Sequence, residues 1–437
     1  FYPPHCFISF RRRISRVIYS PSVPFSIICL AFFLKSQGAS LEILIGISVF
    51  FLSKDIKGRS EPHTTDMKIR KFFSSLYKCS LKVFALILAL FFAFGVPALT
   101  RTAAAPAVSM RTVKQTEPIE HLFTHCLIAH PEIAFAKNNE YGRHLDRDCL
   151  TPSEFRRILQ FLYEGGYALA DIRDTFREKG VYAERIPFDF PADKKPLLLS
   201  FDDVVYASKN QGKGMADKLV VTESGKIAAY TENHSPKVHG EEFVPIVEEF
   251  VAKHPDFSYR GARGTIFLTG FDGILGYRTQ RDSPNRKRET EKAKKVIAAL
   301  KKTGWNFGSH SYAHGHMKKY TAEHMISDAE KWKKEVEPLV GKTQVYAYPY
   351  GEWILGENCS DPRQRALIEA GFRLFCGVGE NPFYVKMPLG ESSTKVLFQD
   401  RCALDGFSLR QGRCARLFSA REVYDASRPV PYPSHAS

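Results

Sequence analysis

The chain has 437 residues, 44% of them hydrophobic, and a formal net charge of +15. Residues 1–104 hold 14 Lys/Arg against 4 Asp/Glu, so the rest of the chain has a balance of only +5. No RNA-binding signature accompanies this charge, which argues against a nucleic-acid partner. The length allows two or three domains or one large barrel.

The first 105 residues resemble an export signal preceded by upstream sequence. The chain begins at Phe1 and its first methionine is Met67, so we interpret residues 1–66 as an upstream or spurious segment. Residues 67–105 combine basic residues, an apolar run at 83–96 and three alanines at 103–105, as a signal peptide does. Without cleavage, the apolar run would be a short membrane anchor. We expect an exported domain, either secreted, held in the cell wall or membrane-anchored, with membrane contact only through this segment.

Six cysteines follow the signal segment and form no CxxC pair, which argues against a zinc knuckle. In an exported protein Cys402 and Cys414, the closest two along the chain, are candidates for a disulfide. Separate buried thiols are the alternative. The six are Cys126, Cys149, Cys359, Cys376, Cys402 and Cys414.

From about residue 111, short apolar runs alternate with amphipathic stretches, which indicates a βα-repeat fold. The predicted strands are 119–129, 197–201, 264–269, 305–308, 345–348, 372–376 and 396–398. The predicted helices are 151–164, capped by Thr151 or Ser153, then 241–253 and 289–302. Residues 206–240 interrupt the alternation as an inserted β-hairpin with strands at 219–221 and 227–230. We expect a flexible tail at residues 426–437.

Two motifs carry the predicted chemistry. A Ser-Phe-Asp-Asp segment at 200–203 ends one apolar strand, and a segment with His310 and His314 follows another. Histidines four residues apart share one side of a helical turn. The carboxyl edge of a parallel sheet gathers such side chains, and a turn there lets adjacent aspartates share a site. We predict that Asp203, His310 and His314 bind a metal ion and that Asp202 is the general base.

One carboxylate, two imidazoles and an open position suit catalytic Zn²⁺, with cobalt, nickel or iron as alternatives. Such an ion activates water and polarises a substrate carbonyl, while Asp202 takes the proton. A third motif, Tyr-Pro-Tyr-Gly at 348–351, follows another predicted strand. Pro349 favours a sharp turn there that can aim the Tyr350 N–H outward.

The three motifs, in this order, resemble those of polysaccharide deacetylases, the NodB-homology domains of carbohydrate esterase family 4. The family's TFDDG-like, HSxxH and RPPYG-like motifs correspond to residues 200–204, 310–314 and 347–351, with Val204 where glycine is usual. The resemblance covers about residues 118–425 and assigns 111–425 to a polysaccharide deacetylase domain.

This resemblance implies a distorted (β/α) barrel that carries the hairpin insertion. It also implies metal-dependent removal of N- or O-acetyl groups from an acetylated polysaccharide, such as a cell-wall or capsular glycan. The implied roles are base for Asp202, metal ligand for Asp203, His310 and His314, and oxyanion donor for the Tyr350 N–H next to Pro349.

Two departures from the family pattern stand out. Ala347 occupies the position of the arginine that orients the base, and no histidine occupies the late motif that supplies a general acid. Arg401 lies near that late position and is a candidate substitute. His125 resembles the early strand-end histidine of poly-N-acetylglucosamine deacetylases, or is a core histidine. Trp353 is a candidate for a sugar subsite or for the core.

The sequence leaves two other functions open. The missing arginine and histidine also fit a catalytically impaired, carbohydrate-binding member of the same fold. Two histidines and one carboxylate would also serve a non-haem iron redox enzyme, although the usual spacing of that triad differs from the one found here.

Overall fold

Residues 108–354, 360–379, 384–388 and 395–433 are described by a computed structural model of the chain. Contacts within the chain assign Pro106–Ser437 to one unit. The predicted upstream segment 1–66, the signal segment 67–105 and Cys359 lie outside the described residues. Within the described ranges, no helix has both the length and the apolar character that crossing a bilayer requires.

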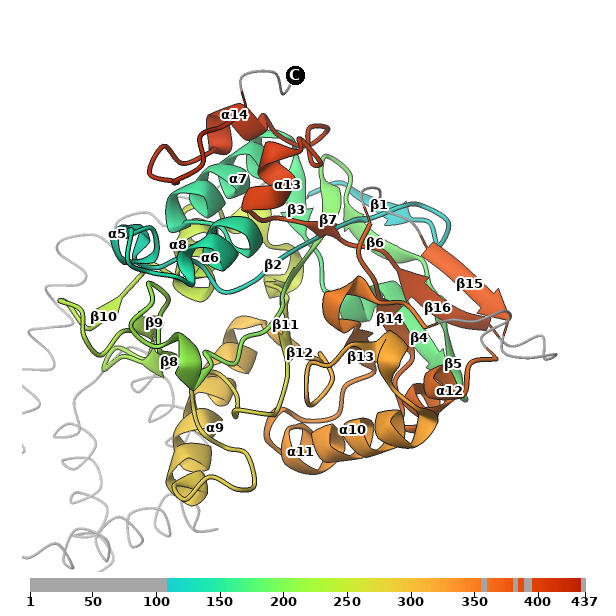
Figure 1. The fold of residues 1–437 in the computed structure, drawn as a ribbon. Helices are drawn as coiled ribbons and strands as arrows, with labels where there is room; N and C mark the ends of the chain where they lie inside the picture. The colour runs from blue at the N-terminus through green and yellow to red at the C-terminus, as the bar shows by residue number, and fades with distance from the viewer. Residues whose placement is uncertain (1–107, 355–359, 380–383, 389–394, 434–437) are drawn as a thin grey trace, which may run out of the picture. The chain divides into compact units, whose positions relative to one another are not determined.

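Seven parallel strands follow one another across the main sheet in chain order (Figure 1). They are β2 (Glu120–Thr124), β7 (Lys195–Phe201), β11 (Thr265–Leu268), β12 (Asn306–Ser309), β13 (Val345–Ala347), β14 (Leu374–Cys376) and β16 (Lys395–Gln399). Three further strands complete this sheet: β3 (Tyr167–Leu169) beside β7, β15 (Tyr384–Pro388) antiparallel to β16, and β17 (Cys402–Ala403) beside β2.

The sheet curls almost into a closed barrel. Strand β17 begins three residues after β16 ends, yet it pairs with β2 at the opposite end of the strand order. The two residues between these strands, Asp400 and Arg401, therefore cross the gap between the two ends of the curled sheet, which we call the barrel seam. The expected distorted (β/α) barrel is confirmed.

The apolar runs of the sequence form these strands because both faces of the sheet are buried. In β7, Leu197, Leu199 and Phe201 belong to one hydrophobic cluster, and Leu198 belongs to a second one. Successive side chains of a strand point to opposite faces, so a continuous apolar run supplies both clusters at once.

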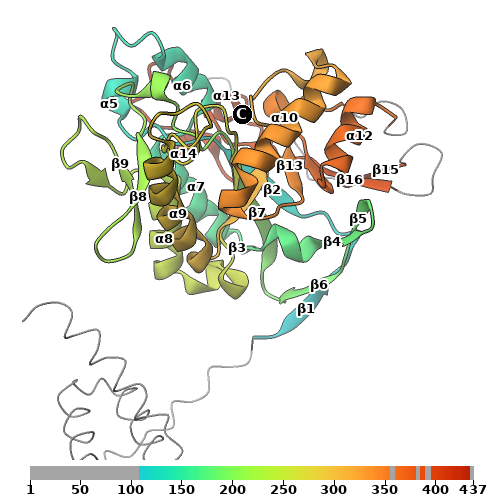
Figure 2. The ribbon, with the colours of Figure 1, turned by 90° about the horizontal axis from the view of Figure 1, so that it is seen from below.

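Helices surround the sheet (Figures 1 and 2). Helix α7 has a capping box in which Thr151 Oγ1 accepts from the Glu154 N–H and the Glu154 carboxylate accepts from the Thr151 N–H. Of the two predicted caps, Thr151 is therefore the one used. The helices are α5 (Pro131–Ala134), α6 (Gly142–Asp148), α7 (Pro152–Glu164), α8 (Phe243–Lys253), α9 (Arg286–Thr303), α10 (Ala322–Glu335), α11 (Glu337–Val340), α12 (Pro362–Glu369), α13 (Gly406–Arg410) and α14 (Ala420–Val423).

The predicted hairpin insertion forms from β8 (Lys218–Val221) and β9 (Ile227–Tyr230), which pair antiparallel. A short strand β10 (Val238–His239) joins β9 on its other side. Four short strands that were not predicted form two more antiparallel pairs: β1 (Met110–Val113) with β6 (Phe188–Pro191), and β4 (Phe176–Lys179) with β5 (Tyr182–Arg185).

The five cysteines in the described ranges are buried free thiols, so the structure has no disulfide between Cys402 and Cys414.

The expectation of a flexible tail from residue 426 is wrong for Arg428. This side chain is buried and forms ion pairs with Asp146 at 3.0 Å and Glu154 at 2.7 Å. Its guanidinium also donates to the Cys149 carbonyl at 2.7 Å. A Pro- and Ser-rich composition indicated an unpacked end, but the chain returns to neutralise two buried carboxylates.

We expect Arg428→Ala to destabilise the domain by about 3–5 kcal/mol, because the buried Glu154 carboxylate loses its ion-pair partner and Asp146 keeps only Arg410. Urea unfolding measures this change. The control is Arg421→Ala, which removes an exposed arginine from the same segment and should change stability by less than about 0.5 kcal/mol. Equal unfolding midpoints for the two variants would show that the terminal segment does not stabilise the domain.

Candidate active site

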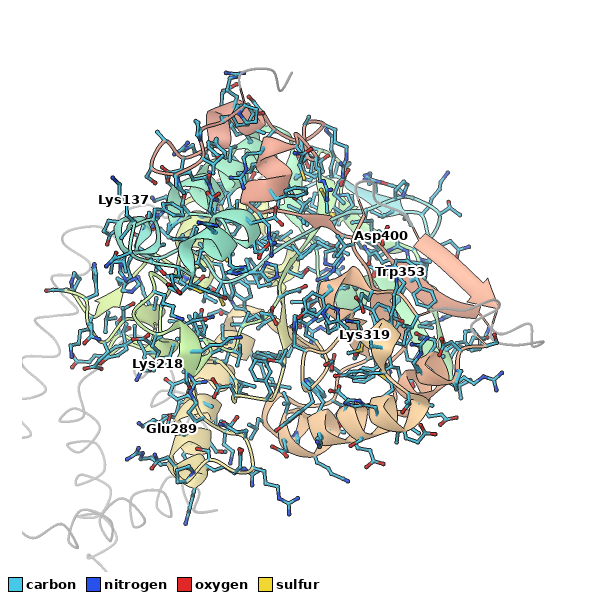
Figure 3. The ribbon with its side chains drawn as sticks, viewed as in Figure 1. Lys137, Lys218, Glu289, Lys319, Trp353 and Asp400 are labelled. Atoms are coloured by element: carbon cyan, nitrogen blue, oxygen red, sulfur yellow. The ribbon has the colours of Figure 1, made fainter. Side chains whose placement is uncertain are left out.

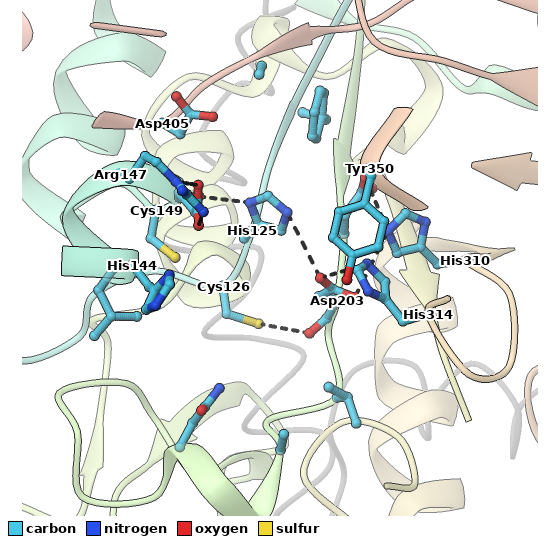
Figure 4. A pocket seen from close by; sticks show the side chains of 18 of the residues that line it. His125, Cys126, His144, Arg147, Cys149, Asp203, His310, His314, Tyr350 and Asp405 are labelled. Carbon is cyan, nitrogen blue, oxygen red and sulfur yellow. Dashed lines mark hydrogen bonds and ion pairs between the residues drawn. The ribbon is translucent and has the colours of Figure 1, made fainter. Parts of the chain in front are cut away.

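A pocket of about 490 Å³ lies at the carboxyl ends of the barrel strands (Figure 4). Its lining brings together the predicted metal ligands, the predicted base, Tyr350 and His125. These residues follow β2, β7, β12 and β13, so strands far apart in the sequence meet at one edge. Loops gather at this edge in barrels of this kind.

Asp203, His310 and His314 place their ligand atoms within 4.8 Å of one another. His314 Nε2 lies 3.3 Å from Asp203 Oδ2, and His310 Nε2 lies 3.9 Å from Asp203 Oδ1. Burial lowers the pKa of His314 to about 4, against the opposing effect of the Asp203 carboxylate. A neutral imidazole is the form that binds metal, so the three residues fit a divalent ion.

The orientation of His310 is set by a backbone group. Its Nδ1 lies 2.9 Å from the Ala347 carbonyl oxygen, and this contact directs Nε2 toward Asp203. Metal-binding histidines commonly donate their second ring nitrogen in this way. Ala347, where the family usually has arginine, therefore contributes through its carbonyl group.

The two histidines do not lie on a helical turn, so that expectation is wrong. They lie in a loop after β12, and Ser311 and His314 have φ angles of 61° and 53°. Asp328 of α10 holds the loop: its carboxylate accepts from the Tyr312 N–H at 2.8 Å and the Ala313 N–H at 2.9 Å. Hydrogen bonds to a buried carboxylate thus offset the cost of left-handed backbone.

The predicted base, Asp202, is buried and bound by Arg401. Arg401 Nη1 and Nη2 donate to its two carboxylate oxygens at 2.7 and 2.8 Å. Burial by itself would raise the pKa of Asp202, but the guanidinium outweighs it and the pKa falls to about 2. Asp202 is therefore ionised and held in one orientation. Arg401 supplies the contact expected of the absent motif arginine, from a different part of the chain.

Arg401 is itself embedded in the barrel. Its guanidinium lies over the rings of Phe123 and Phe267, at 4.2 and 5.1 Å from their centroids. Nε donates to the Gly377 carbonyl, and Nη1 donates to Ser200 Oγ at 3.3 Å. With its donors engaged in this way, Arg401 orients the Asp202 carboxylate, whereas the sequence suggested a substitute for the general acid.

His125 faces the predicted metal ligands across the pocket (Figure 4). Its Nδ1 lies 2.8 Å from the Asp148 carbonyl oxygen, and its Nε2 lies 4.0 Å from Asp203 Oδ2. Burial lowers the pKa of His125, but the Asp203 and Asp202 carboxylates outweigh it and the net pKa is raised. Of the two sequence alternatives, the geometry favours a pocket histidine over a core histidine.

The Pro-Tyr-Gly turn follows β13 as a short 3₁₀ segment, Pro349–Gly351. Pro349 is buried, whereas Tyr350 has a φ of 57° and is 59% exposed. The Tyr350 ring packs against His314, with centroids 4.7 Å apart, and stacks on His316 at 4.2 Å. The turn is therefore held against the loop that carries the predicted metal ligands.

Trp353 and Asp400, both labelled in Figure 3, are not among the residues that line this pocket. Trp353 stacks on Phe398, with ring centroids 5.2 Å apart, and leaves no room for a side chain at Gly377. Asp400 is buried, which raises its pKa to about 6 despite the nearby Arg401. Of the alternatives for Trp353, the packing favours the core.

Three residues of the site were not predicted. Asp328 organises the histidine loop, Ala347 orients His310, and buried His121 contacts Ser200 Oγ at 3.0 Å beneath Asp202. None carries a local signal, since Asp328 lies in an ordinary amphipathic helix and His121 in an apolar strand. The only hint in the sequence is that Asp328 shares the apolar face of α10 with Met325 and Trp332, where an acidic residue is unusual.

Residues 259–367 match the family model described as "Polysaccharide deacetylase". No curated protein sequence matches the chain. Among solved structures, the Streptococcus pyogenes deacetylase PplD in complex with acetate shares 15% identity and a TM-score of 0.37, covering 66% of this chain and 93% of that one. A polysaccharide deacetylase from Bacillus cereus shares 14% identity and a TM-score of 0.35, covering 66% and 65%.

A CE4 family pseudoenzyme from Bacillus anthracis shares 19% identity and a TM-score of 0.20, covering 29% of this chain and 35% of that one. We infer no activity from these likenesses, because all three identities and TM-scores are low. The family model spans the histidine and Pro-Tyr-Gly motifs, whose residues meet the Asp-Asp motif in one pocket. Over residues 259–367 the chain is therefore similar to the polysaccharide deacetylase family.

Proposed function

We propose that the protein is an exported, metal-dependent hydrolase that removes acetyl groups from an amino-sugar polysaccharide. The observation that carries the proposal is the joint placement of the cluster Asp203, His310 and His314 beside an ionised, arginine-bound Asp202. Export rests on the signal-like segment 67–105 of the sequence.

Asp203, His310 and His314 would hold the metal ion, with Zn²⁺ as the best match to two imidazoles and one carboxylate. When bound, the ion supplies Lewis-acid polarisation of the acetyl carbonyl and a water of lowered pKa. The Ala347 carbonyl keeps His310 Nε2 pointed at the site.

Asp202 takes the proton of the attacking water. Its carboxylate lies 3.8 Å from His310 Nε2, and Arg401 keeps it ionised and correctly turned. The Tyr350 N–H donates to the oxygen that becomes negative when water adds to the acetyl carbon. The left-handed backbone at Tyr350 fixes the direction of this donor.

His125 Nε2 donates a proton to the leaving nitrogen as the carbon–nitrogen bond breaks. Its Nδ1 is engaged by the Asp148 carbonyl, so Nε2 is the ring atom that faces the pocket. His125 and Asp202 approach the acetyl group from different strands, which separates the acid from the base. His125 thus takes the proton-donor role for which the late motif has no histidine. Because an amine leaving group needs a proton, this role favours an N-acetyl substrate.

Exposed aromatic rings support a carbohydrate substrate. Phe271, Tyr350 and Phe407 are 40%, 59% and 40% exposed, and all three line this pocket. Within the described residues, no other Phe, Tyr or Trp side chain is as exposed as these three among the large hydrophobic residues at the surface. Rings that present an apolar face to solvent at a site are typical contact surfaces for ligands with apolar faces, including sugars.

Chelation should abolish acetate release from acetylated chitooligosaccharide, and added Zn²⁺ should restore it. Asp202→Asn should keep the wild-type metal content and lose activity by about 10²–10⁴-fold, because only the base is removed. Asp203→Asn should lose metal at this site as well as activity. Acetate release and metal analysis measure these changes. If no acetylated glycan releases acetate in a metal-dependent way, the carbohydrate-binding alternative is favoured. Metal loss in Asp202→Asn would refute the assignment of Asp202 as base and not metal ligand.

Arg401→Met should raise the pKa of Asp202, because the buried carboxylate loses the charge that lowers it. The acidic limb of the kcat/KM profile should then move to higher pH by about one to three units. Arg401→Lys should move it less while still lowering kcat, since a point charge cannot hold both oxygens. Circular dichroism checks folding. An unchanged profile in folded Arg401→Met would exclude an orienting role.

His125→Gln should lower deacetylation of an N-acetyl glycan by about 10²–10⁴-fold, because an amine leaving group needs a proton. The same variant should retain hydrolysis of 4-nitrophenyl acetate, whose phenolate leaves without one. Parallel kinetics on the two substrates measure the difference. Equal losses on both substrates would show that His125 positions the site instead of donating a proton.

A further inference from the structure

A second histidine cluster lies outside the active-site pocket, where the hairpin insertion meets α5. It contains His130 before α5, His234 between β9 and β10, and His239 in β10. The His130 and His234 rings stack with centroids 3.8 Å apart, and the His239 ring lies 5.0 Å from that of His130. Glu132 adds a carboxylate, with Oε1 3.8 Å from His130 Nδ1.

The ligand atoms of His130, Glu132 and His234 all lie within 4.8 Å of one another, as do those of Asp203, His310 and His314. Two imidazoles and one carboxylate are a donor set that Zn²⁺ prefers. Glu132 is 66% exposed, so water has access to further coordination positions.

The buried histidine of this cluster has the polar support that metal-binding histidines need. His130 is nearly fully buried, and its Nε2 lies 3.1 Å from Thr231 Oγ1. Thr231 Oγ1 also lies 2.9 Å from His239 Nε2. A hydroxyl oxygen has two lone pairs and can accept from both rings, which leaves His130 Nδ1 free to bind a cation on the side of Glu132.

The backbone around the cluster is closely packed. The His130 N–H donates to the Gly214 carbonyl at 2.9 Å, and a Cβ at Gly214 would lie only 2.6 Å from Ala134 of α5. Figures 1 and 2 both show α5 beside the insertion strands. The cluster therefore joins two segments whose separation is fixed by backbone contact, so its donors are already in position.

We propose that His130, Glu132 and His234 bind a divalent transition-metal ion of the zinc class in a second, structural site. The ion ties the insertion to α5. Both segments continue into the wall of the active-site pocket. The chain after α5 supplies Tyr141 and His144, and the insertion supplies Tyr206 and Met215. The second site thereby stabilises that wall without contributing to the chemistry.

Equilibrium dialysis of the full chain against excess Zn²⁺, followed by elemental analysis, tests this proposal. His234→Ala should lower the zinc content by one ion per chain, both in the wild-type background and in Asp203→Asn/His314→Ala. The second background separates this site from the catalytic one. Glu132→Gln should weaken binding at the same site, and His324→Ala, which removes an exposed histidine elsewhere, should change nothing.

Thermal unfolding gives an independent readout. In Asp203→Asn/His314→Ala, added Zn²⁺ should raise Tm by a few degrees, and adding His234→Ala should remove the increase. His234 lies on a partly exposed turn, so its replacement leaves no buried cavity. Zero zinc in Asp203→Asn/His314→Ala, or an unchanged zinc content after His234→Ala, would overturn the proposal.

Discussion

The buried ion pair between Arg401 and Asp202 is the constraint around which the active site is arranged. Two opposite charges inside a protein persist only when each is paired and hydrogen-bonded. Here the carboxylate receives two N–H donors, and the guanidinium lies over the rings of Phe123 and Phe267. Asp202 follows β7, whereas Arg401 lies in the passage from β16 to β17. Asp202, the proposed base, is therefore oriented only when the two ends of the sheet meet in the barrel.

The predicted metal ligands depend in the same way on groups that do not bind the metal. His310 is directed by the Ala347 carbonyl, and the loop that carries His314 is held by the Asp328 carboxylate. Left-handed backbone at Ser311 and His314 is costly for such residues, and it persists because the Asp328 contacts define the loop. The predicted metal ligands are thus supported by backbone and side-chain groups of β13 and α10.

The barrel places the proposed catalytic groups, while segments outside it shape the pocket. The insertion and the chain around α6 line one wall, and exposed Phe271 and Phe407 line the pocket as well. This separation means that substrate preference can vary while the catalytic edge stays constant. The proposed second metal site would act on this pocket wall, by fixing the insertion against α5.

The sequence by itself determined what depends on near neighbours in the chain: the apolar strands, the Thr151 cap, the hairpin insertion and the three motifs. Periodicity and turn chemistry are local, so they can be recognised without the fold. Only the tertiary structure decided the partner of Arg401, the loop geometry of His310 and His314, the burial of Arg428 and the joining of His130 with His234. Each of these rests on a contact between residues distant in the chain, and a buried charge or imidazole takes whichever partner the folded barrel places beside it.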